Sequence, residues 1–440
     1  MTKIFHDPCR LTAREAAQAL QSDELSPGEL LDACLRRIAA REPTVRAWAT
    51  LDPTQAAERA RELDGMAPAR RGGLFGLPLG IKDIIDTADF PTQFGSPVFA
   101  GRRPPKDAPV VARALRAGAI LPGKTVTTEL ATFHPADTAN PHNPAHTPGG
   151  SSSGSAAAVA DFHVPLALGT QTVGSVVRPA SFCGIVGFKP SHGWVSLKGV
   201  NPLSVSFDTV GLMARDVSDI WLLWASLSGK SRVRAMTPVV AERPRVAFCR
   251  TPDWPKAEPA MQALVLQTAR DLQAAGVEVD EIEFGEDFSG LHAAHQTVMA
   301  FEAARDLGYI RTKDGDRISP LLGALLAEGD VIPKGEYAEA LDLLRRCRDF
   351  TATLWAKYGL DLLLAPAAPG EAPHGLGSTG DARFNRLWSY LGLPCASLPR
   401  GRGPNGLPLG IQLVGAAGKD AAFLANLEGV WRALDLSPLR

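Results

Sequence analysis

Apolar residues recur at intervals of three and four along the first sixty positions, and this spacing predicts helices within residues 11–62. The clearest begins at Ser26-Pro27, where the serine can cap the helix and the proline suits its first turn, and extends to about Arg41. A further helix is expected over residues 53–63. Charged residues lie between the apolar ones, so each helix is expected to pack one face on a core.

Short apolar runs and longer helical patterns alternate through the second half of the chain. The expected strands are residues 245–249, 277–282, 360–365, 395–398 and 409–414, and the expected helices are 260–275, most of 289–356, 384–391 and the C-terminal end. Nearer the N-terminus we expect a strand within 74–85, a helix over 110–117, a strand at 119–121 and a helix over 216–227. The alternation predicts an α/β fold, and no linker divides the chain, so one domain is expected over residues 1–440.

The most unusual composition lies in residues 148–180. Two loops rich in glycine and serine, at 148–155 and 169–180, flank an apolar segment of helix length at 156–168. Glycine lets backbone N–H groups approach a reacting atom closely, and a serine hydroxyl can attack or relay a proton. The stretch therefore suggests two serines brought together for acyl-transfer chemistry.

Lys82 stands among apolar residues in a segment that should be buried. A buried lysine is costly unless it is paired or neutral. One interpretation is a salt bridge to Asp83 or Asp86, and the other is a neutral lysine that acts as a base.

Composition narrows the class of protein. Hydrophobic residues make up 45% and charged residues 21%, as in ordinary folded proteins, and the formal net charge is −1. Nucleic acids and anionic membranes favour basic partners, so we expect neither. The six scattered cysteines suggest reduced thiols, and the absence of a signal-like or 18-residue apolar segment suggests a cytoplasmic protein.

Three familiar motifs occur in the wrong context. Residues 118–125 match a phosphate-binding loop, but a helix rather than a strand is expected before them. Residues 150–154 match the G-x-S-x-G nucleophile elbow, but they follow irregular loop. The histidines His134, His142 and His146 have spacings that fit no common zinc site. We therefore expect no nucleotide, no metal and no organic cofactor.

Three separated elements together resemble the amidase signature family, and in particular its malonamidase-like branch. They are Lys82, the loop 149–154, and the loop from Gly174-Ser175 to Pro179-Ala180. The resemblance is strong over residues 74–225 and weaker at 361–415. It implies a central mixed β-sheet covered on both faces by α-helices, with N-terminal helices at 11–62 and a sheet-completing part at 360–440.

The resemblance also implies a catalytic triad. Ser175 would be the nucleophile, Ser151 would connect it to Lys82, and the Gly150–Ser151 peptide bond would be cis. The backbone N–H groups of Ser175 and three preceding residues would form an oxyanion hole, and further residues would bind the substrate. The oxyanion residues are Thr172, Val173 and Gly174, and the substrate-binding residues are Arg178, Thr132, Phe133 and Gly150.

Three positions depart from the family pattern. Gln171 replaces an acid, Val173 replaces a small residue, and Val177 replaces an arginine that appears one step later as Arg178. Loss of both members of an acid–arginine pair leaves no orphaned charge. Arg178 would then be available to bind a substrate carboxylate in two-point contact, or alternatively to cap local backbone carbonyls.

The leading interpretation is an amidase that releases ammonia or an amine from a linear carboxamide, with a small, carboxylate-bearing amide as substrate. Its partners would be that small molecule alone, without nucleic acid or membrane. Apolar positions on helices 11–62 would suit a homodimer, although none requires one. Alternatives are hydrolysis of aryl amides, carbamates or esters, a role within a multi-protein glutamine-dependent amidotransferase, and a non-catalytic scaffold.

Overall fold

A computed structural model describes residues 7–229, 239–241, 243–283, 288 and 290–438. These residues form an 11-stranded sheet in the order β1-β3-β2-β4-β6-β5-β10-β11-β9-β7-β8. The strands are β1 (Trp48–Leu51), β2 (Leu79–Lys82), β3 (Gly123–Thr125), β4 (Leu166–Gln171), β5 (Val186–Lys189), β6 (Thr209–Ala214), β7 (Val246–Arg250), β8 (Val279–Glu283), β9 (Leu362–Pro366), β10 (Cys395–Arg402) and β11 (Pro408–Val414).

The sheet is mixed. Strands β3, β2 and β4 are parallel neighbours, as are β9, β7 and β8, and the strands between these two groups pair antiparallel. The antiparallel β10–β11 pair lies near the middle and joins the C-terminal part of the chain to β5. The expected α/β fold with a mixed sheet is confirmed.

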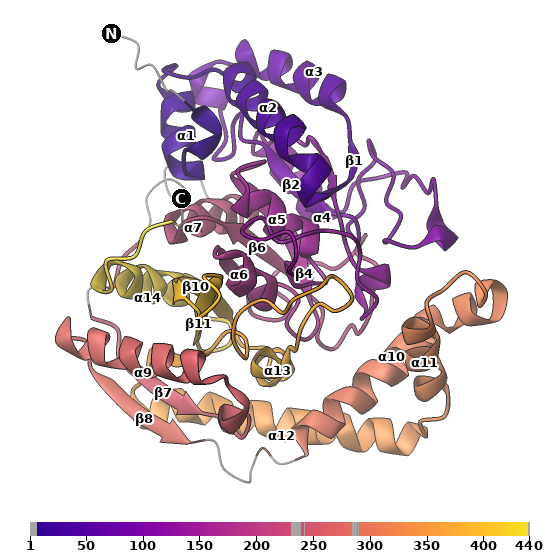
Figure 1. The fold of residues 1–440 in the computed structure, drawn as a ribbon, viewed down its shortest axis with the longest axis vertical. Helices are drawn as coiled ribbons and strands as arrows, with labels where there is room; N and C mark the ends of the chain where they lie inside the picture. The colour runs from indigo at the N-terminus through magenta and orange to yellow at the C-terminus, as the bar shows by residue number, and fades with distance from the viewer. Residues whose placement is uncertain (1–6, 230–238, 242, 284–287, 289, 439–440) are drawn as a thin grey trace.

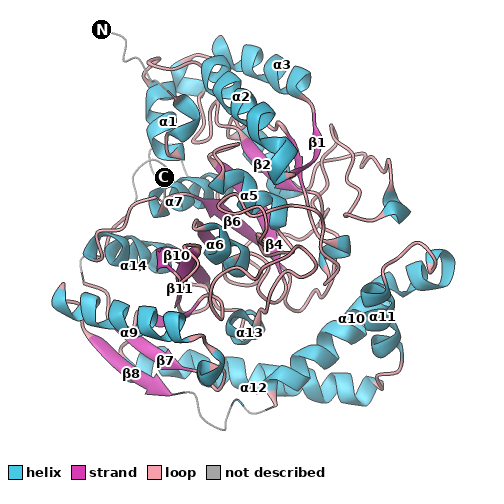
Figure 2. Cartoon of the chain, viewed as in Figure 1, coloured by secondary structure: helices cyan, strands magenta, loops and turns pink. Residues whose placement is uncertain are grey.

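Helices pack on the faces of the sheet (Figures 1 and 2). They are α1 (Ala13–Gln21), α2 (Pro27–Val45), α3 (Pro53–Asp64), α4 (Pro109–Arg116), α5 (Ser153–Ala160), α6 (Val177–Cys183), α7 (Val217–Leu227), α9 (Pro259–Ala274), α10 (Leu291–Asp314), α11 (Pro320–Asp330), α12 (Lys334–Tyr358), α13 (Arg383–Tyr390) and α14 (Asp420–Ala433). Helices α10, α11 and α12 form an arm that extends beyond the sheet (Figure 1).

The start of α2 agrees with the sequence-based expectation. Ser26 accepts a hydrogen bond from the backbone N–H of Glu29, and the Glu29 side chain accepts one from the Ser26 backbone. Pro27 occupies the first helical position, where its missing N–H costs nothing. This reciprocal cap satisfies two backbone donors at the end of the helix.

Two local expectations are wrong. Residues 156–168 are not one helix-length segment: α5 ends at Ala160 and β4 begins at Leu166. Pro165 lies between them, where its ring and missing N–H would disrupt a continuing helix. The strand expected at 119–121 contributes only a bridge from Ile120 to Pro78, and the paired strand is β3.

The buried hydrophobic side chains of the described residues form one large cluster and two smaller ones. All six cysteines are buried and free of disulfides, as expected. None of the helices within the described ranges combines the length and apolar character needed to cross a bilayer.

Candidate active site

Parallel pairing of β2 and β4 brings distant residues to one edge of the sheet. Ile81 lies beside Leu168 in this pairing, and both strands run toward the same edge. Lys82 is the last residue of β2, while Thr170 and Gln171 end β4. The carboxyl ends of parallel strands are where α/β proteins commonly place their sites.

Lys82 is fully buried and contacts hydroxyl groups rather than a carboxylate. Its Nζ lies 2.8 Å from Ser151 Oγ and 2.8 Å from Thr170 Oγ1. The two acids considered as partners are engaged elsewhere: Asp83 pairs with Lys124, and Asp86 with Arg102. Burial lowers the pKa of Lys82 well below its usual value, which favours the neutral amine.

The first glycine- and serine-rich loop leads into α5. The Gly150–Ser151 peptide bond is cis, as expected from the resemblance. Ser152 ties this loop to the second one, since its N–H donates to the Ser175 carbonyl at 3.4 Å and its Oγ accepts the N–H of Thr170 at 3.2 Å. The two loops are therefore adjacent, although no hydrogen bond between the Ser151 and Ser175 hydroxyls is present among the described residues.

Residues 172–175 form a wall of a cavity of about 190 Å³. Within the described part of the chain, the backbone N–H groups of Val173, Gly174 and Ser175 meet no acceptor. Gly174 is required here, because a Cβ would lie 2.4 Å from Asn385 Oδ1. A loop of unpaired donors beside a serine has the form of an oxyanion hole.

Gln171 holds this loop from behind. Its Oε1 accepts the N–H groups of Val176 and Val177, at 2.9 and 3.1 Å. Its Nε2 donates to Ser389 Oγ, which in turn donates to the carbonyl of Val173 at 2.6 Å. The C=O and N–H of a trans peptide point in opposite directions, so fixing the Val173 carbonyl also directs the Gly174 N–H.

The amide of Gln171 makes one contact that the acid of the usual pattern could not make, which is the donation to Ser389. A carboxylate at position 171 can accept the two helix N–H groups, but it cannot donate to Ser389. Ser389 would then turn its proton toward the carboxylate and release the Val173 carbonyl. The side chain of Val173 itself lines the cavity and narrows it.

Asp208 connects the same loop to Leu203, which also lines the cavity. Its Oδ1 accepts a hydrogen bond from Thr172 Oγ1 at 2.5 Å, and its Oδ2 accepts the N–H groups of Leu203 and Ser204. Burial raises the pKa of Asp208 to about 6, against the opposing effect of these hydrogen bonds. Its negative charge in turn raises the pKa of Lys82, against the larger effect of burial.

Arg178 is held by three protein oxygens. Its guanidinium donates to the carbonyls of Gly380 and Gly150, at 3.0 and 2.6 Å, and to Thr379 Oγ1 at 3.1 Å. Burial lowers its pKa to about 10. These contacts correspond to the capping alternative, although Arg178 also lines the cavity.

Of the other three residues expected to bind substrate, two line the cavity and one does not. Thr132 and Phe133 both line the cavity, and Phe133 is 47% exposed at its mouth. Thr132 also donates its hydroxyl to the Glu129 carbonyl at 2.6 Å. Gly150 is not on the cavity wall and contributes its carbonyl to Arg178.

The motifs in the wrong context have other roles. Lys124, from the phosphate-loop pattern, is buried on β3 and donates to the Ile85 carbonyl and to Thr92 Oγ1. His142 and His146 bond to separate backbone carbonyls, of Cys183 and Ala372. No group of three potential metal ligands occurs among the described residues.

The sequence-based expectations missed several residues at the site. Thr170 lies within the second glycine-rich loop but had no assigned role, and Asp208 was detectable as the one charged residue of the stretch 199–214. Ser389 and Arg386 carry no local signal, since both lie on α13, more than 200 positions from the nucleophile loop.

Comparisons with known proteins agree on one family. The family model described as Amidase matches residues 29–424. A solved structure described as an amidase superposes with a TM-score of 0.86 and 32% identity, covering 96% of this chain and 99% of that one.

Curated relatives carry a more specific name. A Chloroflexus aurantiacus protein, named as one of the subunits of glutamyl-tRNA(Gln) amidotransferase, is 38% identical over 318 residues, which cover 70% of this chain and 60% of that protein. The match therefore spans less than two thirds of that relative. A Halothermothrix orenii protein of the same name is 30% identical over 482 residues, with 98% of each covered.

These names contradict the expected partners. The sequence suggested a small-molecule amide alone and no nucleic acid, whereas the relatives are named for an amidotransferase of glutamyl-tRNA(Gln). A net charge of −1 is a sum over the whole chain, so it excludes neither a local basic surface nor a nucleic acid held by another protein of a complex.

Proposed function

Because the chain belongs to the amidase family, we propose that it cleaves the C–N bond of a carboxamide through an acyl group carried on Ser175. The observation that carries this proposal is the 2.8 Å contact between Lys82 Nζ and Ser151 Oγ, beside the loop that presents Ser175 to the cavity. A neutral lysine next to a chain of hydroxyls is a suitable general base.

Thr170 prepares Lys82 for this task. The neutral amine donates one N–H to Thr170 Oγ1, which leaves its lone pair available to the Ser151 hydroxyl. Lys82 then takes the proton of Ser151, and Ser151 takes the proton of Ser175. The Ser175 oxygen attacks the amide carbonyl carbon and forms a tetrahedral intermediate.

The negative charge of this intermediate lies on the former carbonyl oxygen. The free N–H groups of Val173, Gly174 and Ser175 stabilise it, at about 3–4 kcal/mol for each well-placed donor. The proton returns through Ser151 to the leaving nitrogen, and the C–N bond breaks. Water then attacks the acyl-enzyme with the same base and releases a carboxylate.

A serine-to-alanine pair tests the nucleophile. Ser175→Ala should lower kcat by about 10⁴-fold or more while the protein stays folded. Ser153→Ala is the matched control, because Ser153 is the first residue of α5, directly after the neighbouring loop, and its buried Oγ has no hydrogen-bond partner among the described residues. Mass spectrometry of a slowly hydrolysed ester should find the acyl group on Ser175; parent activity in Ser175→Ala would overturn the assignment.

The acyl-enzyme chemistry is shared by amides, aryl amides, carbamates and esters. Substrates with one acyl group and different leaving groups separate these classes. We expect a primary amide to be turned over, with free ammonia as product.

A second candidate is favoured by the names of the curated relatives. In this role the chain is the component of an amidotransferase that releases ammonia from glutamine, for transfer to glutamyl-tRNA(Gln). The chemistry at Ser175 is unchanged, and the difference lies in the fate of the ammonia and in the need for other proteins of the complex.

Purification of the tagged chain from its own cells tests this role. Copurified partner proteins, together with glutamine-dependent conversion of glutamyl-tRNA(Gln), would support the amidotransferase. A chain that purifies alone and hydrolyses amides at full rate would exclude it.

A further inference from the structure

The positively charged side chain of Arg386 lines the cavity and makes few contacts with other protein groups. Arg386, from α13, lines the cavity together with Ser175. Its one hydrogen bond among the described residues joins Nη1 to His292 Nδ1 at 3.3 Å, and its buried Nε has no acceptor. Arginine presents five N–H donors; since the Nε–H is buried, the Nη donors that His292 does not accept are the ones available to a ligand.

No carboxylate among the described residues forms an ion pair with Arg386, although the charges of Asp381 and Asp253 raise its pKa against the larger effect of burial. Asp381 also lines the cavity, and its carboxylate accepts the backbone N–H and the Nε of Arg383. Arg178 brings a second positive charge; its Nη1 and Nη2 donate to three protein oxygens, and its buried Nε has no partner among the described residues. The cavity therefore keeps a surplus of positive charge beside the nucleophile.

The guanidinium of Arg386 is also held in place before a ligand arrives. His292 Nε2 lies 3.1 Å from Asp253 Oδ2 and donates to it, which leaves Nδ1 as the acceptor for Arg386. A planar guanidinium fixed from behind can bind a carboxylate with two parallel hydrogen bonds. A partly buried, unpaired arginine is costly, and a bound anion removes that cost.

We propose that Arg386 binds a carboxylate on the acyl portion of the substrate. The inference rests on the proposed function, because it assigns the carboxylate to the cavity in which Ser175 attacks the amide. Since a primary amide leaves only ammonia, the carboxylate belongs to the acyl portion. The substrate class is then an ω-amide of a dicarboxylic acid, either plain or with an amino group, as in glutamine.

Three amides of equal chain length test the proposal. Glutaramate and glutamine place the carboxylate at the same distance from the amide and differ only in the amino group. Pentanamide has a methyl group in place of the carboxylate. We expect Arg386→Gln to lower kcat/KM for glutaramate, glutamine or both by tenfold or more, and to change it less than twofold for pentanamide.

The control variant is Arg345→Gln, which removes an equal charge from an exposed pair with Asp342 on α12. It should leave all three values unchanged. The ratio of glutamine to glutaramate shows which of the two sources the site prefers. An equal loss on all three amides, or no loss on any, would overturn the role of Arg386.

A binding measurement separates this inference from the proposed function. Calorimetry with glutarate and glutamine compares Ser175→Ala with the double variant that adds Arg386→Gln. Tenfold weaker binding by the double variant supports the carboxylate site even if no amide is hydrolysed. Equal binding, or none by either, rejects it even if the wild-type enzyme hydrolyses amides.

Discussion

Lys82 shows how the chemistry of one side chain depends on which neighbours are already engaged. Its sequence neighbours Asp83 and Asp86 were plausible salt-bridge partners, but Lys124 and Arg102 hold them. What reaches Lys82 instead is two hydroxyl groups, which accept or donate protons without neutralising a charge. The same burial that makes a charged lysine costly therefore yields a base.

The pH dependence of activity follows from these groups. Only neutral Lys82 can accept a proton, so kcat/KM falls as the pH drops through its pKa, which burial holds well below 10.5. Ionised Asp208 favours the protonated form and raises that pKa. Asp208→Asn removes the charge, so the acid limb of the profile should move to lower pH.

The plateau of kcat/KM should also fall in Asp208→Asn, by about tenfold, because an amide has only one acceptor oxygen: if it accepts the N–H groups of Leu203 and Ser204, its NH2 faces Thr172 Oγ1, which can no longer donate there. Asp420→Asn is a matched control. Asp420 is also a buried acid that accepts a backbone N–H, from Ser191, but it does not line the cavity. It should leave the profile in place. A limb that moves to higher pH in Asp208→Asn would contradict the assignment of Lys82 as the base.

At the scale of elements, close packing of α10 and α11 depends on one small residue. Gly329 of α11 lies against α10, and a Cβ at this position would come within 1.9 Å of the Ala300 carbonyl oxygen. Ala300 neighbours Met299, which lines the cavity. The arm that extends beyond the sheet therefore reaches back to the site through this helix pair.

Gly329→Ala should force the two helices apart and lower the free energy of unfolding by about 1–3 kcal/mol. Gly323→Ala tests the same change in the same helix, where the new Cβ would meet only Ile318 Cδ1 at 4.0 Å. It should be neutral or stabilising by about 0.5–1 kcal/mol, because alanine favours helices over glycine. Thermal unfolding of both variants measures the difference. An equal change in the free energy of unfolding for the two would contradict the packing argument.

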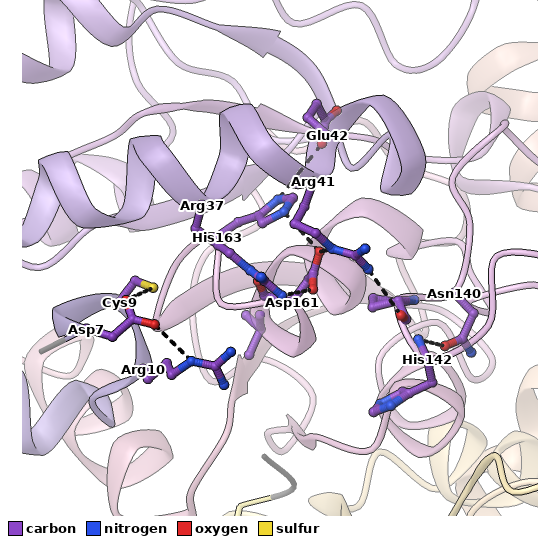
Figure 3. A network of polar contacts seen from close by, with 12 residues as sticks. Asp7, Cys9, Arg10, Arg37, Arg41, Glu42, Asn140, His142, Asp161 and His163 are labelled. Carbon is purple, nitrogen blue, oxygen red and sulfur yellow. Dashed lines mark hydrogen bonds and ion pairs between the residues drawn. The ribbon is translucent and has the colours of Figure 1, made fainter.

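At the scale of the whole molecule, a buried acid links the N-terminal helices to the nucleophile region. Asp161, just after α5, pairs with Arg37 and Arg41 of α2 (Figure 3). His163 Nε2 lies 3.3 Å from the same carboxylate, and His163 Nδ1 accepts the indole Nε1–H of Trp48. The segment that follows α5 therefore contacts α2 and β1, which lie more than 100 positions earlier in the chain.

Loss of this charge should weaken the whole fold. Asp161→Asn is expected to lower the free energy of unfolding by about 2–3 kcal/mol at pH 7, less than for a fully buried pair because both arginines are partly exposed. Glu62→Ala, which breaks the exposed pair with Arg59, should cost under about 0.5 kcal/mol. Similar losses of unfolding free energy in both variants would show that the ion pairs of Asp161 stabilise the fold no more than an exposed pair does.

The sign of the pH effect follows from the pKa of Asp161. Burial alone would raise it, but the interactions with His163 and Arg41 lower it below its usual value. The folded protein therefore holds this proton less tightly than the unfolded chain. The stabilisation is complete at neutral pH and is lost only as the pH falls below about 4.

Most of the elements were predictable from short windows of sequence. Helical periodicity and the Ser26-Pro27 cap located α2, and apolar runs located β7 to β9 and β11. Strands β1, β3 and β6 were missed: β1 and β3 have only four and three residues, and β6 is interrupted by Gly211. Strand β3 also contains a glycine and a buried lysine that no strand propensity favours. Their pairing depends on neighbours elsewhere in the chain.

The order and spacing of Lys82, Ser151 and Ser175, together with ordinary residue chemistry, were enough to indicate the family and the reaction class, because these features lie in the sequence itself. Only the tertiary structure decided that Asp83 leaves Lys82 unpaired, that Arg178 is held by protein oxygens, and that Arg386 faces the cavity. The reason is physical: charge, burial and hydrogen bonding at a site depend on side chains that the tertiary packing brings together. That packing puts Arg386 of α13 and Ser175, more than 200 positions apart in the chain, on the same cavity.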